Sequence, residues 1–311
     1  MHPAFSIIFF TTATGAGYGL LALLGIFAAI DLLPADRRFG LISLGLAITL
    51  ITAGLLSSTL HLGRPERAWR AFSQWRSSWL SREGVASLFT FIPAGLFGAG
   101  WVFFERTDGI VATAGLVAAA GAALTVVATG MIYASLKPVA HWNSPYTLPA
   151  YLIFAAMTGA VLLNAILHLW GSPARAAESM ALITIVIGWI WKVITWRHND
   201  RLTSPVTANS ATALAEGQVR SIEWPHTEEN YVLKEMGYRI ARKHAAKLRV
   251  FVQVCAFAVP LVATGTALLT SGRTAQAAAV IALLVQVPGI LVERWLFFAE
   301  AKHIVTLYYG R

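Results

Sequence analysis

A histidine, an arginine and a glutamate stand close together in this sequence, at the edges of two apolar stretches. His61 and Arg64 lie in Ser58-Thr-Leu-His-Leu-Gly-Arg-Pro-Glu-Arg-Ala-Trp-Arg70, and Glu83 opens the next apolar stretch. A histidine gives or takes one proton near neutral pH, a carboxyl group can relay a proton, and a guanidinium stays charged. These residue types suit a site where a bound group changes its protonation and charge. The alternative is that His61 and Glu83 are ordinary interfacial residues, with Glu83 paired to Arg64 or Arg82.

The stretches that position these residues are long and apolar. Hydrophobic residues make up 57% of the 311 residues and charged residues only 13%, about half the usual charged fraction of a soluble domain. A helix needs about 20 apolar residues to cross a bilayer. The sequence therefore predicts one membrane domain over 1–311, an all-α bundle of eight transmembrane helices at roughly 5–32, 40–62, 83–104, 110–136, 147–170, 178–197, 249–271 and 275–299.

The distribution of Lys and Arg predicts the orientation. An even number of crossings puts both termini on one side, side A, together with the loops 63–82, 137–146 and 197–248. Side B holds five of the 24 Lys and Arg residues (Arg37, Arg38, Arg106, Arg175 and Arg273), and the other 19 lie on side A or at its boundary. Cytoplasmic loops are enriched in Lys and Arg, so side A is predicted to be cytoplasmic. The same rule accounts for the net charge of +9 without nucleic acid.

His61 and Glu83 fall at the side A ends of two consecutive helices and therefore at the same membrane depth. A two-electron, two-proton carrier such as a quinone needs a donor to its carbonyl and a route for a proton. We expect the quinone head group at His61, Glu83 and Arg64, with Trp69 at the entrance. The single cysteine, Cys255, excludes a Cys-ligated iron–sulfur cluster held by this chain, so any clusters belong to a partner.

Two side A segments are predicted to be more than connections. Within the loop 63–82, Glu66–Trp79 alternates aromatic and basic residues at helical spacing, which is typical of a short helix in the headgroup layer. The long polar loop 197–248 turns helical near Thr227, where a capping threonine precedes two acids. This loop is either connecting chain or a docking surface, and we favour docking because long loops without a role are uncommon.

The last helix offers a second polar region. Glu293 and Arg294 lie within it, and His303 follows toward side A, so these three are secondary candidates for the site. We expect Glu293 to form a structural ion pair rather than to react. Lys192, near the end of the sixth helix, is expected to extend to the surface.

Histidines also bear on whether haem b binds, which usually requires two histidines at matching depth. His61 and His168 lie toward opposite sides and cannot share one iron, while His141 and His303 look like loop or tail residues. A pairing of His61 with either is conceivable, but haem b is not expected. His168 shares a helix face with Asn164 near side B, where a hydrogen-bonded buried histidine is favoured over the start of a polar path.

Three motifs resemble the membrane-anchor subunit of anaerobic dimethyl-sulfoxide reductase. They are the opening Met1–Gly19, the block Leu60–Arg70 and Ser81-Arg-Glu83. The resemblance covers the whole chain and implies a non-catalytic anchor that holds an iron–sulfur subunit and, through it, a molybdopterin catalytic subunit at the bacterial inner membrane. It also implies electron exchange with quinone, with His61 and Glu83 as the quinone-site residues. Arg64 stands where the family varies.

The basic segment Glu235–His244 is more similar to the branch of that family that serves cytoplasmic sulfite dehydrogenase complexes. That branch implies soluble partners on side A and reduction of ubiquinone or menaquinone. One alternative is the anchor of a reductase that oxidises menaquinol. A more distant alternative is a stand-alone transporter, but the inverted repeats and broken helices typical of transporters are not evident.

Overall fold

The structure is a computed structural model that describes residues 5–59, 64–203, 206–214, 217, 219, 222–223 and 243–304. Within those residues the chain is helical and has no strand. The helices are α1 (Phe5–Ala29), α2 (Arg37–Thr59), η1 (Pro65–Gln74), α3 (Trp79–Phe104), α4 (Gly109–Ala134), α5 (Thr147–Trp170), α6 (Arg175–Asp200), α7 (Ala208–Thr212), α10 (Ala245–Val252), η2 (Gln253–Ala258), α11 (Val259–Leu269) and α12 (Gly272–Ala299).

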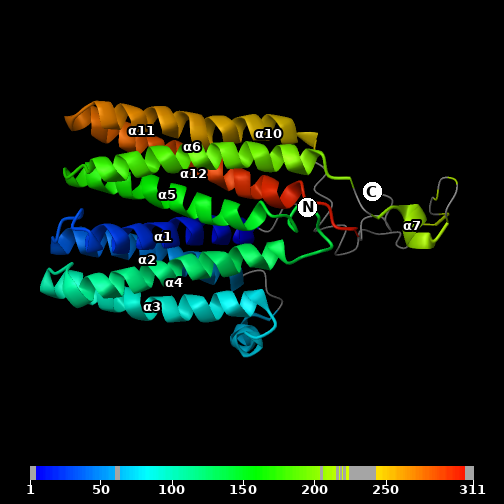
Figure 1. Cartoon of the computed structure of the whole chain (residues 1–311), viewed down its shortest axis with the longest axis horizontal. Helices are drawn as coiled ribbons and strands as arrows, with labels where there is room; N and C mark the ends of the chain where they lie inside the picture. Colours follow the sequence, from blue (N-terminus) through cyan, green and yellow to red (C-terminus); the bar gives the residue numbers. More distant parts are fainter. Residues whose placement is uncertain are drawn as a thin grey trace.

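Eight spans in the described part of the chain are long and apolar enough to cross a membrane, with α10, η2 and α11 forming one continuous span. The predicted eight-helix membrane bundle is therefore confirmed, and the chain is a multi-pass membrane protein. The start of α1, the end of α12 and α7 all lie at the same end of the bundle (Figure 1). We call it the η1 end, because η1 lies there too; it corresponds to side A. Its exposure to the cytoplasm stays a prediction.

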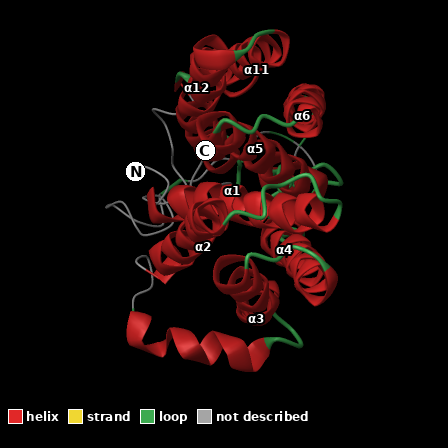
Figure 2. Ribbon diagram, turned by 90° about the vertical axis from the view of Figure 1, so that its left-hand side faces the viewer, coloured by secondary structure: helices red, strands yellow, loops and turns green. Residues whose placement is uncertain are grey.

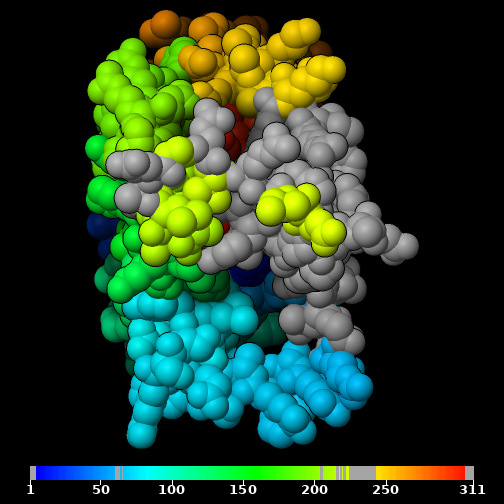
Figure 3. Space-filling model, turned by 90° about the vertical axis from the view of Figure 1, so that its right-hand side faces the viewer, coloured from blue at the N-terminus to red at the C-terminus, as the bar shows by residue number. Residues whose placement is uncertain are grey.

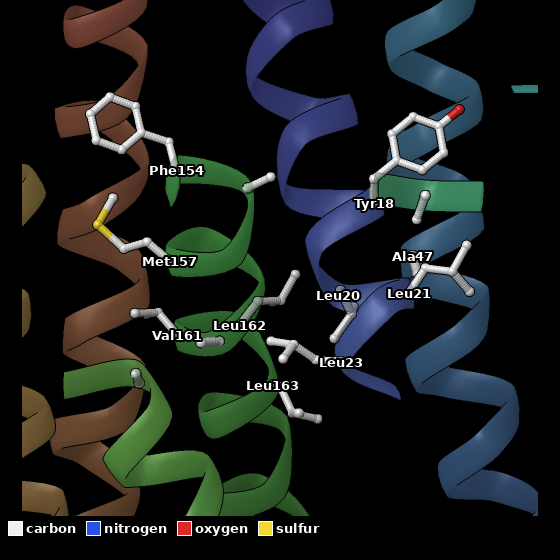
Figure 4. Packing of buried hydrophobic residues seen from close by; sticks show 14 of the residues in the cluster. Tyr18, Leu20, Leu21, Leu23, Ala47, Phe154, Met157, Val161, Leu162 and Leu163 are labelled. Carbon is white, nitrogen blue, oxygen red and sulfur yellow. The ribbon is translucent and has the colours of Figure 1, made fainter. Parts of the chain in front are cut away.

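The centre of the bundle is α1, which packs against α2, α4, α5 and α12 (Figure 2). Buried apolar side chains of α1 and α5 fill the space between them, including Leu20 and Leu163 (Figure 4). The two helices come closest at Gly19 and Gly159, where a Cβ on either glycine would overlap the backbone of the other helix. This packing joins the α1–α4 half to the half formed by α5, α6 and α10–α12.

Two predicted boundaries differ from the structure in ways that matter for function. Helix α3 begins at Trp79 because the hydroxyl of Ser78 caps it, accepting a hydrogen bond from the Ser81 N–H at 3.5 Å. Glu83 therefore lies inside the helix instead of at its start. The loop predicted over 197–248 is shorter, because α6 continues to Asp200 and the next span begins at Ala245. The helix predicted after Thr227 lies outside the described residues.

The segment η1 is a 3-10 helix that runs crosswise to the bundle (Figures 1 and 2). The hydroxyl of Ser81 donates a hydrogen bond to the carbonyl of Ala71, and the ring of Phe72 lies over Gly84, which joins η1 to α3. Figure 3 looks onto the η1 end and shows η1 along one edge of it. The crosswise orientation is compatible with a position of η1 in the headgroup layer, which remains a prediction.

Candidate functional site

A cavity of about 810 Å³ lies at the η1 end, between α1, α2, η1, α3 and α4. Most of its wall is apolar, from residues such as Phe10, Leu55 and Phe91. Its polar and charged lining residues are Ser58, Thr59, Arg64, Arg67, Ser81, Glu83, Ser87 and Tyr133. An apolar wall with a few polar groups is typical of a ligand site, and the volume lies within the usual range of about 300–1,000 Å³.

Glu83 is the acidic group on the cavity wall. Its side chain is nearly buried, with the residue 4% exposed, and it accepts a hydrogen bond from the hydroxyl of Thr129 on α4. Among the described residues it forms no ion pair with Arg64 or Arg82. Arg82 instead donates hydrogen bonds to the carbonyls of Trp75 (3.0 Å) and Arg76. The interpretation of Glu83 as half of an interfacial ion pair is therefore wrong.

Three hydroxyl groups near Glu83 were not singled out from the sequence. Ser87 lies one helical turn after Glu83 on the same wall and accepts a hydrogen bond of 2.8 Å from the buried hydroxyl of Tyr18. Thr129 bonds Glu83 itself. The four-residue spacing of Glu83 and Ser87 is a helical repeat that could have indicated Ser87. Nothing local in the sequence pairs Glu83 with Tyr18 or Thr129, because those partners lie on other helices.

The remaining predicted site residues lie around the same cavity or outside the described part. Arg64 and Trp69 both line it, and Trp69 is 66% exposed at its mouth. His61 lies outside the described residues. The described residues on either side of that gap, Thr59 and Arg64, both line the cavity. The structure thus brings Arg64, Trp69 and Glu83 to one cavity.

Two of the three secondary candidates, Glu293 and Arg294, form a separate charged cluster with Lys192 between α6 and α12. Lys192 donates a hydrogen bond to Glu293 Oε1, and Arg294 Nε lies 3.3 Å from Glu293 Oε2. The predicted ion pair of Glu293 is therefore present. Lys192 is 5% exposed, so the expectation that it extends to the surface is wrong, because a buried carboxylate holds its ammonium group. His303 follows α12 and is half-buried; it does not line the cavity next to this cluster.

At the opposite end of the bundle, His168 and Glu178 form a buried pair with Nε2 and Oε1 3.0 Å apart. The predicted hydrogen-bonded histidine is present there. Asn164, one turn away, is also buried, and its amide has no partner within the described residues. No group of three or more His, Cys, Asp or Glu side chains in the described part of the chain is placed to hold a metal ion.

Comparison with known proteins covers nearly the whole length of the chain. The family model described as DMSO reductase anchor subunit (DmsC) matches residues 1–310. A similar protein is the C subunit of sulfite dehydrogenase from Allochromatium vinosum, 33% identical over 327 aligned residues that cover 99% of each chain. No solved structure matches. The chain belongs to the DMSO reductase anchor subunit family.

Proposed function

We propose that this protein is the quinone-reactive membrane anchor of a molybdopterin oxidoreductase, and that quinone binds in the 810 Å³ cavity. The observation that carries the proposal is the position of Glu83. It is a nearly buried carboxyl group with a hydroxyl partner and, among the described residues, no cation, on the wall of a mostly apolar cavity. A quinone has matching chemistry, since its head group takes up protons and its tail is apolar.

In this proposal one quinone oxygen accepts a hydrogen bond from His61, and Glu83 supplies a proton to the other quinone oxygen. Arg64, which lines the same cavity, stabilises negative charge as electrons arrive, because its guanidinium remains charged. Trp69 forms part of the entrance. The hydroxyl of Ser87 offers a further polar contact at the inner wall.

The electrons come from an iron–sulfur subunit docked at the η1 end, which in turn binds the molybdopterin subunit. Support comes from the anchor family and from Cys255, since one cysteine cannot hold such a cluster. We expect the docking surface to include the loop 63–82 and the long loop before α10. The basic balance at that end supports a cytoplasmic location at the bacterial inner membrane.

The relative named as part of a sulfite dehydrogenase supports electron flow from the partner into quinone. Two electrons and two protons then convert quinone to quinol, with the protons taken from the same side as the electrons. The family description, which names a reductase anchor, supports the reverse direction as the second candidate, in which menaquinol is oxidised. The same side chains would serve both directions.

The experiment is a comparison of two electron acceptors in the assembled complex. His61→Ala is expected to abolish turnover with quinone and to leave turnover with an artificial soluble dye unchanged, because the dye reacts with the partner subunits. Wild-type quinone turnover in this variant would place the site elsewhere. The direction follows from whether sulfite reduces quinone or menaquinol reduces a sulfoxide.

A further inference from the structure

Two cavities of water size adjoin the charged cluster of Lys192, Glu293 and Arg294. One lies between this cluster and Thr129, the partner of Glu83, and the other extends from the cluster toward the η1 end. We propose that these cavities, with Lys192, Glu293 and Arg294, form a proton-transfer path from the aqueous phase at the η1 end to Glu83. The inference rests on the quinone site proposed above and adds the residues through which its protons arrive.

The first cavity begins one hydrogen bond away from Glu83. Its volume is about 20 Å³, enough for one water molecule. Thr129, which donates its hydroxyl to Glu83, lines this cavity together with Thr12, Tyr151 and Arg294. A water here has hydroxyl groups on several sides, which is the environment that buried water requires. The cavity thus connects the acid of the quinone site to α12.

Thr12 is the side chain in this cavity that most clearly points to a ligand. Its neighbours Thr11 and Thr14 donate their hydroxyls to the carbonyls of Ile7 (3.0 Å) and Phe10 (2.7 Å) in their own helix. The hydroxyl oxygen of Thr12 is buried and has no hydrogen-bond partner within the described residues. Such a group costs stability unless something pairs with it. A water in the cavity it lines would provide that partner.

The charged cluster leads from the first cavity to the second. Arg294 lines both cavities, and its Nε lies 3.3 Å from one oxygen of Glu293. The other oxygen of Glu293 accepts the hydrogen bond from Lys192. All three side chains line the second cavity, also about 20 Å³. The carboxylate therefore has one oxygen toward each cation, and only one of these cations, Arg294, also reaches the first cavity.

The second cavity leads to groups that meet water. Asn199 and Glu300 line it at the η1 end. Glu300 accepts a hydrogen bond of 2.7 Å from Arg249, and Arg249 also donates two bonds of 2.8 Å to Asp200. The carboxylate of Asp200 is about half exposed, at 53%. Exposed and half-buried carboxylates of this kind can collect protons from water.

The reaction balances as follows in this scheme. Quinone gains two electrons from the reduced iron–sulfur partner and two protons from water, and leaves as quinol. Glu83 gives a proton to a quinone oxygen and recovers one through the first cavity. Waters and hydroxyls carry the proton, and Glu293 holds it only transiently because two cations favour its anion. A separate path is useful because the walls of the quinone cavity are mostly apolar.

The test uses the purified heterotrimeric complex in proteoliposomes and a matched pair of valine variants. Thr12→Val removes the hydroxyl that lines the first cavity. Thr264→Val is the control, because the Thr264 hydroxyl is equally buried and unpartnered within the described residues, yet lines none of the three cavities. Neither substitution leaves a described protein group without its hydrogen-bond partner, so both variants should fold. Tyr151→Phe provides a second variant on the path.

Thr12→Val is expected to lower the quinone-coupled kcat by about tenfold, less than the loss of a positioned acid or base. The KM for quinone should stay constant and the solvent deuterium isotope effect should increase. Thr264→Val should match the unmodified complex in kcat, in KM and in the solvent deuterium isotope effect. If Thr12→Val and Tyr151→Phe both behave like Thr264→Val while Glu83→Gln is slow, the path is wrong and the quinone site stands. If Glu83→Gln is also unaffected, Glu83 is not the proton donor and the proposed quinone site is wrong as well.

Discussion

Each half of the bundle buries a glutamate, but the two carboxyl groups have different partners. Glu83, in the α1–α4 half, borders a large cavity, and its partner among the described residues is the hydroxyl of Thr129. Glu293, in the other half, lies between Lys192 and Arg294. A buried carboxylate without a cation carries a large desolvation cost, and two cations offset that cost. This difference supports the proposal that Glu83 exchanges a proton, whereas the two cations beside Glu293 favour its anion.

The largest expected effect concerns the stability of the charged half. Glu293→Gln leaves Lys192 and Arg294 buried without their anion, which should lower the free energy of unfolding by about 3–5 kcal/mol. Thermal unfolding of the complex in detergent measures this loss. Glu83→Gln is the matched control, since Thr129 can still bond an amide and no cation among the described residues loses a partner. Equal destabilisation by the two substitutions would contradict the assignment of different roles.

The second prediction compares the same two glutamates by quinone-coupled turnover, where the substitution of Glu83 should have the larger effect. Glu83→Gln should lower quinone-coupled turnover by about 100-fold or more, the usual loss for a positioned proton donor. Turnover with a soluble dye should not change, because it bypasses the cavity. Assays of one preparation with both acceptors separate the two rates. A quinone rate within about threefold of the unmodified complex would mean that Glu83 is not the proton donor.

The contrast between the two glutamates could be only partly predicted from the sequence. The helix count and the ion pair of Glu293 follow from apolar length, spacing and composition. The shared depth of His61 and Glu83 stays a prediction, because His61 lies outside the described residues. The partner of Glu83 does not, because Thr129 lies on a different helix and its approach depends on how α3 packs against α4.

Lys192 shows why the prediction was wrong in the other half. Near the end of a transmembrane helix, a lysine usually extends to the interface. The sequence does not reveal that α12 places Glu293 beside it, more than a hundred positions along the chain. The pairing of distant charges is decided by tertiary packing. The start of a helix is also hard to predict from the sequence. Helix α3 was predicted to begin at Glu83, but the cap at Ser78 lets it begin at Trp79.

The third prediction tests whether the cavity in the α1–α4 half admits the substrate. Leu88 lines the cavity, whereas Leu96, on the same helix, does not. Both side chains are about equally exposed, at 60% and 63%. Leu88→Trp should obstruct the cavity and raise the KM for quinone about tenfold, equivalent to about 1.4 kcal/mol of binding. Leu96→Trp should leave the KM unchanged, and a similar rise in both variants would point to a general effect on folding.

The smallest expected effect concerns the arginines at the mouth of the cavity. Arg64 lines the cavity, and Arg70, an exposed residue of η1, does not. Exposed charge interactions contribute up to about 1 kcal/mol, so Arg64→Gln should raise the KM for quinone by about two- to fivefold. Arg70→Gln should change it less than the error of the assay. The effect of Arg64→Gln should diminish at high salt, because ions screen exposed charges. Steady-state assays at two ionic strengths measure this, and an effect that persists at high salt would indicate that Arg64 acts from a site shielded from water.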